Sequence, residues 1–86
     1  MPEPLDYESH LSLEAVAFVV ALLKKRQRLL LDLADQISRQ PFQIGDYQTR
    51  DAADRTIENL VLEKYLFSFW VDHASREVRI SEIVRV

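Results

Sequence analysis

The side chains in this sequence whose types could do chemistry lie in its C-terminal half. They are three arginines and one histidine: Arg55, Arg79, Arg85 and His73. Guanidinium groups bind phosphate or carboxylate groups, and alternation along predicted strands allows the arginines to share one face of a sheet. His73 follows Asp72, and a neighbouring carboxylate can orient a histidine as a general base. These four residues are therefore the candidate catalytic set.

A structural role competes with the catalytic one for each of these residues. The arginines can form surface ion pairs with Glu58, Glu77 and Glu82. Asp72-His73 is also ordinary turn chemistry, in which the carboxylate accepts hydrogen bonds from nearby backbone amides. We favour the structural interpretation for both groups. The sequence contains no fixed carboxylate pair, nucleophile turn or metal-ligand spacing, so we predict no catalytic dyad, no metal and no cofactor.

The composition bounds the class of protein. The chain has 86 residues, no cysteine, one glycine, 48% hydrophobic residues and a formal net charge of −3. This length fits a single domain spanning residues 1–86, and the lack of cysteine permits a reducing compartment. The longest apolar run, Ala15 to Leu23, is shorter than the roughly 20 residues that cross a membrane, and no basic segment precedes it. We therefore expect a soluble, cytoplasmic protein.

Charge is unevenly distributed along the chain. Residues 1–20 carry four acids and no lysine or arginine, whereas residues 21–40 carry five basic residues against two aspartates. Because affinity for nucleic acid comes mainly from neutralised phosphates, the acidic total disfavours a general nucleic-acid binder. The basic cluster leaves room for one specific contact, but we interpret it as a solvated helix face. Its members are Lys24, Lys25, Arg26 and Arg28.

Residues 12–40 are predicted to be helical. Ser12 suits the N-cap, and no glycine or proline follows it before Pro41, which ends the helical segment. One helix of about 28 residues would form a rod about 42 Å long, which so small a domain could not bury along its whole length. A helical hairpin broken near residues 24–27 is therefore favoured. The first half is apolar almost all round, which predicts burial on several sides, with self-association as the rival explanation.

Residues 55–84 are predicted to form the sheet, because apolar and polar side chains alternate there between turn residues. The predicted strands are 55–62, 65–71 and 77–83. Glu63-Lys64 is expected to form a two-residue reversal. Residues 1–11 are expected to be irregular or to form a weak strand, and residues 50–54 a loop or one helical turn. The predicted fold class is α+β, with an N-terminal helical hairpin packed on a C-terminal antiparallel meander of three strands.

Two segments carry a family resemblance, LADQISRQPFQIGDY and KYLFSFWVDHASREVRISEI. Together with the order of the predicted elements, they make the stretch from Ser12 to Val86 resemble the RelE/ParE superfamily. These proteins are the toxins of bacterial type II toxin–antitoxin systems, including plasmid-stabilisation modules. The resemblance implies a short first strand, a helical hairpin and a three-stranded meander. It also implies a cognate antitoxin that wraps the toxin with a helix or an added strand.

The family divides into two activities, and the nuclease residues do not carry over. One branch cleaves messenger RNA on the ribosome with basic side chains, and the other poisons DNA gyrase. Positions that are lysine in the nuclease branch are Ile57 and Asn59 here, and an expected arginine is Leu66. Only Arg85 falls near an expected basic position, and a terminal aromatic is missing at Val86. The resemblance therefore favours poisoning of a protein target, as ParE does, over RNA cleavage.

Two alternatives to that activity remain open at this point. One is a weak ribosome-dependent endoribonuclease, and the other is a non-toxic regulatory homo-oligomer with the same fold. In the favoured reading the antitoxin covers the apolar helical hairpin, a sheet edge, or both, and a homodimer is possible. The candidate partner-binding residues are Phe18, Leu22, Leu30, Leu33, Ile37 and Trp70.

Overall fold

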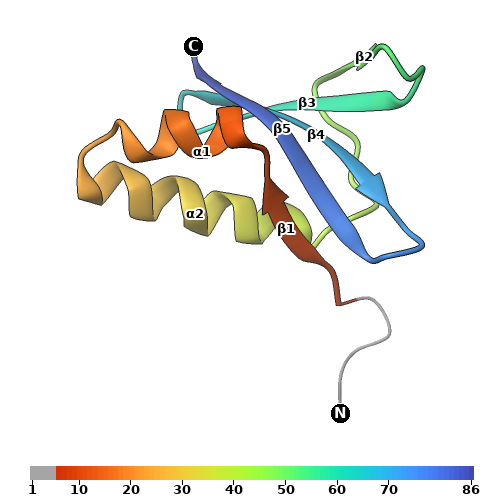
Figure 1. The fold of residues 1–86 in the computed structure, drawn as a ribbon, viewed down its shortest axis with the longest axis horizontal. Helices are drawn as coiled ribbons and strands as arrows, with labels where there is room; N and C mark the ends of the chain where they lie inside the picture. The colour runs from red at the N-terminus through yellow and green to blue at the C-terminus, as the bar shows by residue number, and fades with distance from the viewer. Residues whose placement is uncertain (1–5) are drawn as a thin grey trace.

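The computed structural model describes residues 6–86, which form two helices on one face of a five-stranded sheet (Figure 1). The elements are β1 (Glu8–Leu11), α1 (Leu13–Val20), α2 (Lys24–Ser38), β2 (Tyr47–Arg50), β3 (Thr56–Leu62), β4 (Tyr65–Asp72) and β5 (Glu77–Arg85). The strand order is β1-β5-β4-β3-β2, with β1 parallel to β5 and all other neighbours antiparallel. This arrangement confirms the predicted α+β class and contains one strand more than was expected.

The predicted helical hairpin is present, with its break at residues 21–23, just before the expected position. No glycine or proline makes this break. Instead, the Gln27 side chain donates hydrogen bonds from Nε2 to the carbonyl oxygens of Leu22 at 2.8 Å and Val20 at 3.4 Å. These bonds satisfy carbonyl groups that the end of α1 leaves without helical partners. The backbone can therefore turn back at Leu23, which has the extended conformation that precedes α2.

The first helix is fastened to the sheet through its N-cap. Ser12 Oγ accepts a hydrogen bond from the backbone amide of Ala15 at 3.1 Å and donates one to the carbonyl oxygen of Ser81 at 2.7 Å. The predicted cap is confirmed, and it also joins α1 to β5. Because cap substitution by alanine typically removes about 1 kcal/mol, this one hydroxyl contributes to both local and tertiary stability.

The core lies between the two helices and the central strands. Tyr65, Phe67 and Phe69 of β4 are fully buried and belong to one apolar cluster with side chains of both helices and of β5. Their neighbours Leu66, Ser68 and Trp70 point to the other face, as alternation along a strand requires. The sequence favours a core position for all four aromatic residues of β4; this is confirmed for Tyr65, Phe67 and Phe69, whereas Trp70 is only part-buried, on the face of the sheet that carries no helix.

The predicted reversal between β3 and β4 is confirmed. Leu62 and Tyr65 are paired residues, so the loop contains only Glu63 and Lys64. Both have positive φ, 51° and 70°, which is the backbone geometry of a type I′ turn. Residues with a side chain are strained there, because the left-handed region favours glycine.

Of the two edge strands of the sheet, the sequence indicated one and not the other. The predicted weak N-terminal strand exists as β1, although residues 1–5 of the predicted irregular stretch lie outside the described residues. At the other edge, residues 47–50 form β2 and pair with β3, although no strand was predicted there. All four β2 residues are exposed and do not alternate in polarity, so no pattern signals this strand. Gly45 allows the chain to approach β3, since a Cβ there would lie 2.6 Å from the Asn59 carbonyl oxygen.

Candidate functional site

The sheet face turned away from the helices carries the positions where the resemblance places nuclease side chains. We call this surface the open face and define it by Ile57, Asn59, Ser68, Trp70 and Arg79. Asn59 pairs with Ser68 across β3 and β4, and Trp70 pairs with Arg79 across β4 and β5. The alternate residues of β4 and β5 point into the helix-covered core. The two positions expected to be lysine in a nuclease therefore do lie together on one face.

A closed hydrogen-bond network occupies the centre of the open face. Ser68 Oγ donates to Asn59 Oδ1 at 2.7 Å, and both residues are buried, with 7% and 4% exposure. Asn59 Nδ2 donates to the Thr49 hydroxyl at 3.1 Å and to the Tyr47 carbonyl at 3.3 Å. Ile57 beside them is buried as well. These polar groups hold β2, β3 and β4 together, so they are not available to a substrate.

Two of the candidate arginines meet at Trp70. The guanidinium carbon of Arg55 lies 4.1 Å from the centre of the indole ring, and that of Arg79 lies 5.9 Å away. Each arginine is also ion-paired, Arg55 with Asp51 at 2.7 Å and Arg79 with Glu77. The predicted partner of Arg79 is confirmed, whereas that of Arg55 is Asp51 and not Glu58. Both positive charges on this face are therefore already compensated.

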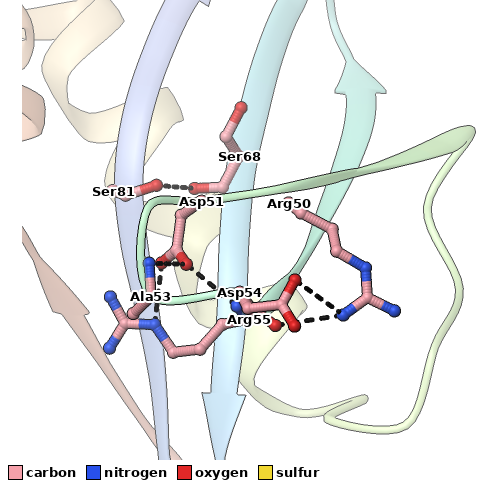
Figure 2. A network of polar contacts seen from close by, with 7 residues as sticks. All are labelled: Arg50, Asp51, Ala53, Asp54, Arg55, Ser68 and Ser81. Carbon is pink, nitrogen blue, oxygen red and sulfur yellow. Dashed lines mark hydrogen bonds and ion pairs between the residues drawn. The ribbon is translucent and has the colours of Figure 1, made fainter.

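The loop before β3 positions Arg55. Figure 2 shows Asp51 accepting hydrogen bonds from the backbone amides of Ala53 and Arg55, both at 2.9 Å. The Arg55 backbone amide, and then its side chain, lower the pKa of the Asp51 carboxyl below its ordinary value of 3.8. Across the same loop, Arg50 Nη1 donates to the Asp54 carbonyl oxygen at 3.0 Å. The expected loop thus carries a carboxylate that fixes its shape and the guanidinium beside it.

The third candidate arginine lies apart from the other two. Arg85 pairs with Tyr65 at the far end of β5 and lines a hollow with Arg26, Leu29 and Lys64. It does not contact Trp70, so the three arginines do not form one site. The predicted contact with Glu82 is also absent from the ion pairs of residues 6–86.

The contacts of His73 are those of a residue that stabilises the fold. Its Nδ1 lies 2.8 Å from the Tyr7 hydroxyl, and its ring stacks on Phe42 with the centres 4.9 Å apart. Asp72 does not orient it, because the Asp72 carboxylate accepts from the backbone amides of Ala74 at 3.1 Å and Ser75 at 3.3 Å. The predicted turn role of Asp72 is therefore confirmed. The aromatic cluster joins three segments distant in sequence, which no local pattern could indicate.

A second histidine, which the sequence offered no reason to choose, lies closer to the open face. The parallel pairing of β1 with β5 places His10 opposite Arg79. His10 Nε2 is 3.2 Å from Glu77 Oε2, while the other oxygen of that carboxylate accepts from Arg79. RNA cleavage needs a general acid, a general base and cations around the phosphorane. Here His10 and Arg79 both contact the Glu77 carboxylate, so the three groups are paired with one another.

The first helix exposes most of its apolar side chains, contrary to the predicted burial on several sides. Only Ala15 and Val19 are buried. We define the α1 stripe as four apolar residues with 41–88% exposure: Leu13, Val16, Val20 and Leu23. Leu13, Val16 and Val20 are spaced by three or four residues, which puts them on one side of the helix, and Leu23 follows three residues after its end. A surface of this kind is typical of a protein-binding site.

The six predicted partner-binding residues divide into three groups, of which the first is Trp70 alone, part-buried on the open face beside Arg55 and Arg79. Leu30, Leu33 and Ile37 are buried in the core, so a partner could reach them only by opening the hairpin. Phe18 and Leu22 are partly buried against the core, and the Phe18 ring packs edge-on against Tyr65 with the centres 6.1 Å apart. The α1 stripe therefore offers a better binding surface than the residues chosen from the sequence. Exposure depends on which side of α1 faces the sheet, and the continuous apolar run gave no such signal.

Basic side chains without an ion pair gather at one end of the fold. Lys24, Lys25, Arg26 and Arg28 lie in the first turns of α2, which has no acidic residue in its first turn and no side-chain cap. Within residues 6–86, none of them forms an ion pair. The predicted solvated face is consistent with their exposure. Positive charge is disfavoured near a helix N-terminus, so this cluster slightly destabilises α2.

Two further classes of site can be judged from the described residues. Residues 6–86 contain no group of three or more histidine and carboxylate side chains placed to hold a metal ion. None of the helices in that part of the chain is long and apolar enough to cross a membrane.

Comparisons with known proteins identify the fold. A chain of the toxin–antitoxin complex RelBE2 from Mycobacterium tuberculosis is 16% identical and superposes with a TM-score of 0.76, over 94% of this chain and 99% of that one. A chain of the archaeal RelE–RelB complex from Pyrococcus horikoshii OT3 is 17% identical, with a TM-score of 0.67 over 93% and 94%. Neither protein-family models nor curated protein sequences match this chain. The protein therefore has the fold found in RelE–RelB complexes.

Proposed function

We propose that this chain is the toxin-type component of a type II toxin–antitoxin pair, and that it acts by binding a protein target. The observation that carries the proposal is the RelE-type fold combined with an exposed α1 stripe. Both similar chains come from toxin–antitoxin complexes, which supports a cognate antitoxin as the partner. The net charge of the chain, which is mildly acidic at −3, gives no independent support for an antitoxin partner.

Two surfaces suit an antitoxin. An amphipathic helix can bury its apolar side on the α1 stripe, since Leu13, Val16 and Val20 are exposed at helical spacing and Leu23 is exposed just after the helix. A peptide strand can also add to β2, which is an edge strand with all four residues exposed. We assign the larger share of affinity to the stripe, because burying apolar area contributes about 25 cal/mol per Å².

Protein-target poisoning is favoured over RNA cleavage because of the open face. Its centre is filled by Ile57 and Asn59, the two positions where the resemblance implies lysine in a nuclease, and Asn59 is buried and hydrogen-bonded to Ser68. The two arginines beside Trp70 are each held by a carboxylate. A phosphodiester placed there would meet compensated charges, and breaking the ion pairs would offset much of the attraction. A gyrase-type target therefore ranks above the ribosome.

The test is expression of this chain alone in bacterial cells, with growth, bulk translation and DNA supercoiling followed together. Arrest with DNA damage and intact translation is the expected result. Arrest with immediate loss of translation would overturn the protein-target assignment and favour a ribosome-dependent nuclease. Absence of arrest would overturn toxicity and favour a regulatory homo-oligomer.

The antitoxin is tested separately, by capture of the product of the adjacent gene on the purified chain. Val20→Glu is expected to weaken capture at least tenfold, because it places a charge in the α1 stripe. Val61→Glu is the matched control, since Val61 is also exposed but lies on β3. Equal loss with both variants, or no capture by the unmodified chain, would contradict the assigned surface.

A further inference from the structure

One end of the fold carries positive charge that the chain itself does not compensate. Of the eleven lysine and arginine residues, four form ion pairs within residues 6–86, which leaves seven that form none. Six of these seven lie in the first turns of α2 or line a hollow beside them. We call this group the basic end, and all of its members are exposed: Lys24, Lys25, Arg26, Arg28, Lys64 and Arg85. Because the whole chain is acidic, this local concentration of cations indicates an anionic partner.

Two hollows lie within the basic end, and each has a leucine beside its cations. The first hollow is lined by Arg26, Lys64, Arg85, Leu29 and Glu63. The second hollow is lined by Lys24, Arg28, Leu31, Gln27 and Asp32. In both hollows the cations outnumber the single carboxylate. A partner that fits them therefore brings negative charge and apolar side chains together.

The cations of α2 point in different directions. Consecutive residues of a helix are about 100° apart, so Lys24, Lys25 and Arg26 fan out over roughly 200° of its circumference. Lys24 and Arg26 accordingly line different hollows. A flat membrane surface or a rigid nucleic-acid duplex could contact only some of these side chains at once. A flexible chain that follows the start of α2 could contact all of them.

The leucines favour a peptide over a single-stranded nucleic acid. Proteins that bind single strands stack the bases on aromatic side chains along a positive groove. Within residues 6–86, no aromatic side chain lines either hollow, and Leu29 and Leu31 lie among the cations instead. Leu31 is 51% exposed, so an apolar side chain of a partner could cover it.

We propose that the basic end binds an acidic segment of a partner protein, in which carboxylate and apolar residues alternate. The carboxylates pair with guanidinium groups such as those of Arg26 and Arg85, which accept them in a bidentate geometry. The apolar residues of the segment cover Leu29 and Leu31. Assigning the segment to the antitoxin rests on the proposed function, whereas the binding surface itself does not. The basic end begins at Lys24, directly after the last residue of the α1 stripe, so one antitoxin could cover both surfaces.

The first test is a titration of the isotope-labelled chain, followed by nuclear magnetic resonance, with three separate probes. The first probe is a synthetic peptide of about 12 residues, in which pairs of glutamates alternate with single leucines and which reaches roughly 40 Å when extended. The other two are oligouridylate RNA and vesicles of anionic phospholipid. The peptide is expected to shift the resonances of Arg26, Leu29, Lys64 and Arg85, with a dissociation constant below about 1 mM. Tighter binding of the RNA or the vesicles, or no saturable shift with the peptide, would overturn the proposal.

Charge reversals locate the binding surface. Arg26→Glu and Arg85→Glu should each weaken peptide binding about fivefold, because repulsion replaces an exposed ion pair. Arg76→Glu is the matched control, since it changes the net charge equally at an exposed residue outside the basic end. Leu31→Ser should weaken binding about threefold, which ionic attraction alone would not do. Equal weakening by Arg76→Glu, or no effect of Leu31→Ser, would contradict the assigned surface. Circular dichroism should be unchanged in all four variants, because the four side chains are exposed.

Capture of the adjacent gene product separates this inference from the proposed function. Weaker capture by Arg26→Glu/Arg85→Glu, with normal capture by Arg76→Glu, would place the acidic segment in the antitoxin. A chain that binds the peptide but captures no adjacent gene product refutes the antitoxin partnership alone. A chain that captures this product equally with and without Arg26 and Arg85, and does not bind the peptide, refutes the inference alone.

Discussion

Removal of one buried hydroxyl on the open face is expected to destabilise the fold measurably. Ser68 Oγ donates to Asn59 Oδ1 at 2.7 Å, and both side chains are almost completely buried. Within residues 6–86, no buried side-chain nitrogen or oxygen lacks a hydrogen-bond partner. Ser68→Ala therefore takes the Ser68 hydrogen bond away from the amide oxygen of Asn59 in a site that water barely reaches.

The magnitude follows from the cost of that lost bond. A buried polar group left without a partner typically destabilises by about 1–3 kcal/mol, so we expect Ser68→Ala to lower the free energy of unfolding by about 2 kcal/mol. In a domain of this size, each kcal/mol lowers the melting temperature by roughly 4–8 °C, which gives a decrease of about 12 °C. Asn59→Ala should cost at least as much, because Asn59 Nδ2 also holds the Tyr47 carbonyl of β2.

Urea unfolding followed by Trp70 fluorescence, with circular dichroism as a second probe, measures this change. The double variant Ser68→Ala/Asn59→Ala should be more stable than the sum of the single losses predicts, by about 1–2 kcal/mol, since the two side chains bond to each other. Ser75→Ala is the control, because Ser75 is exposed in the turn before β5. A loss below about 0.5 kcal/mol for Ser68→Ala, or additive losses in the double variant, would refute the buried network.

Three further predictions follow from the backbone geometry at Lys64 and Gly45 and from the hydrogen bonds of the Asp72 carboxylate. Lys64→Gly should stabilise by about 1 kcal/mol, seen as a higher melting temperature, because Lys64 has a φ of 70°; a lower value would contradict the turn geometry. Gly45→Ala should destabilise by about 2 kcal/mol in urea, since its Cβ would lie 2.6 Å from the Asn59 carbonyl oxygen; a neutral effect would contradict that close approach. The Ser75 backbone amide lowers the pKa of the Asp72 carboxyl below 3.8 in the folded state, so its stabilising contribution is complete above about pH 5 and is lost as pH falls through the folded pKa. Urea midpoints measured from pH 6 to 2 should therefore fall less for Asp72→Asn than for the unmodified chain, and equal slopes would contradict the role of this carboxylate.

The elements that the sequence predicted well are those with a strong local cause. Pro41 ends the helical segment, Ser12 caps its start, and the aromatic row of β4 marks the central strand. The reversal at Glu63-Lys64 followed from two alternating segments separated by two residues. Each of these signals depends only on neighbours in the chain.

The parts that the sequence did not predict depend on distant contacts. The exact position of the hairpin break, at residues 21–23 and not 24–27, depends on Gln27, whose amide reaches back to the end of α1. The strand β2 has no pattern of its own and is fixed by hydrogen bonds from Asn59. His73 was chosen for its type and its neighbour Asp72, but Tyr7 and Phe42 determine its surroundings. In each case the residue that fixes the local structure lies between several and several dozen positions away in the sequence.

The sequence by itself determined the α+β class, the meander and the absence of lysine at the two nuclease positions, because periodicity and residue type are local properties. Tertiary structure alone decided which side of α1 is covered. An apolar helix can bury any of its sides, and here the side with Ala15 and Val19 is buried, which leaves Leu13, Val16 and Val20 exposed. It also decided that Arg55 and Arg79 meet at Trp70 with their charges compensated. Such pairing depends on strand register, which side-chain alternation along one strand does not specify.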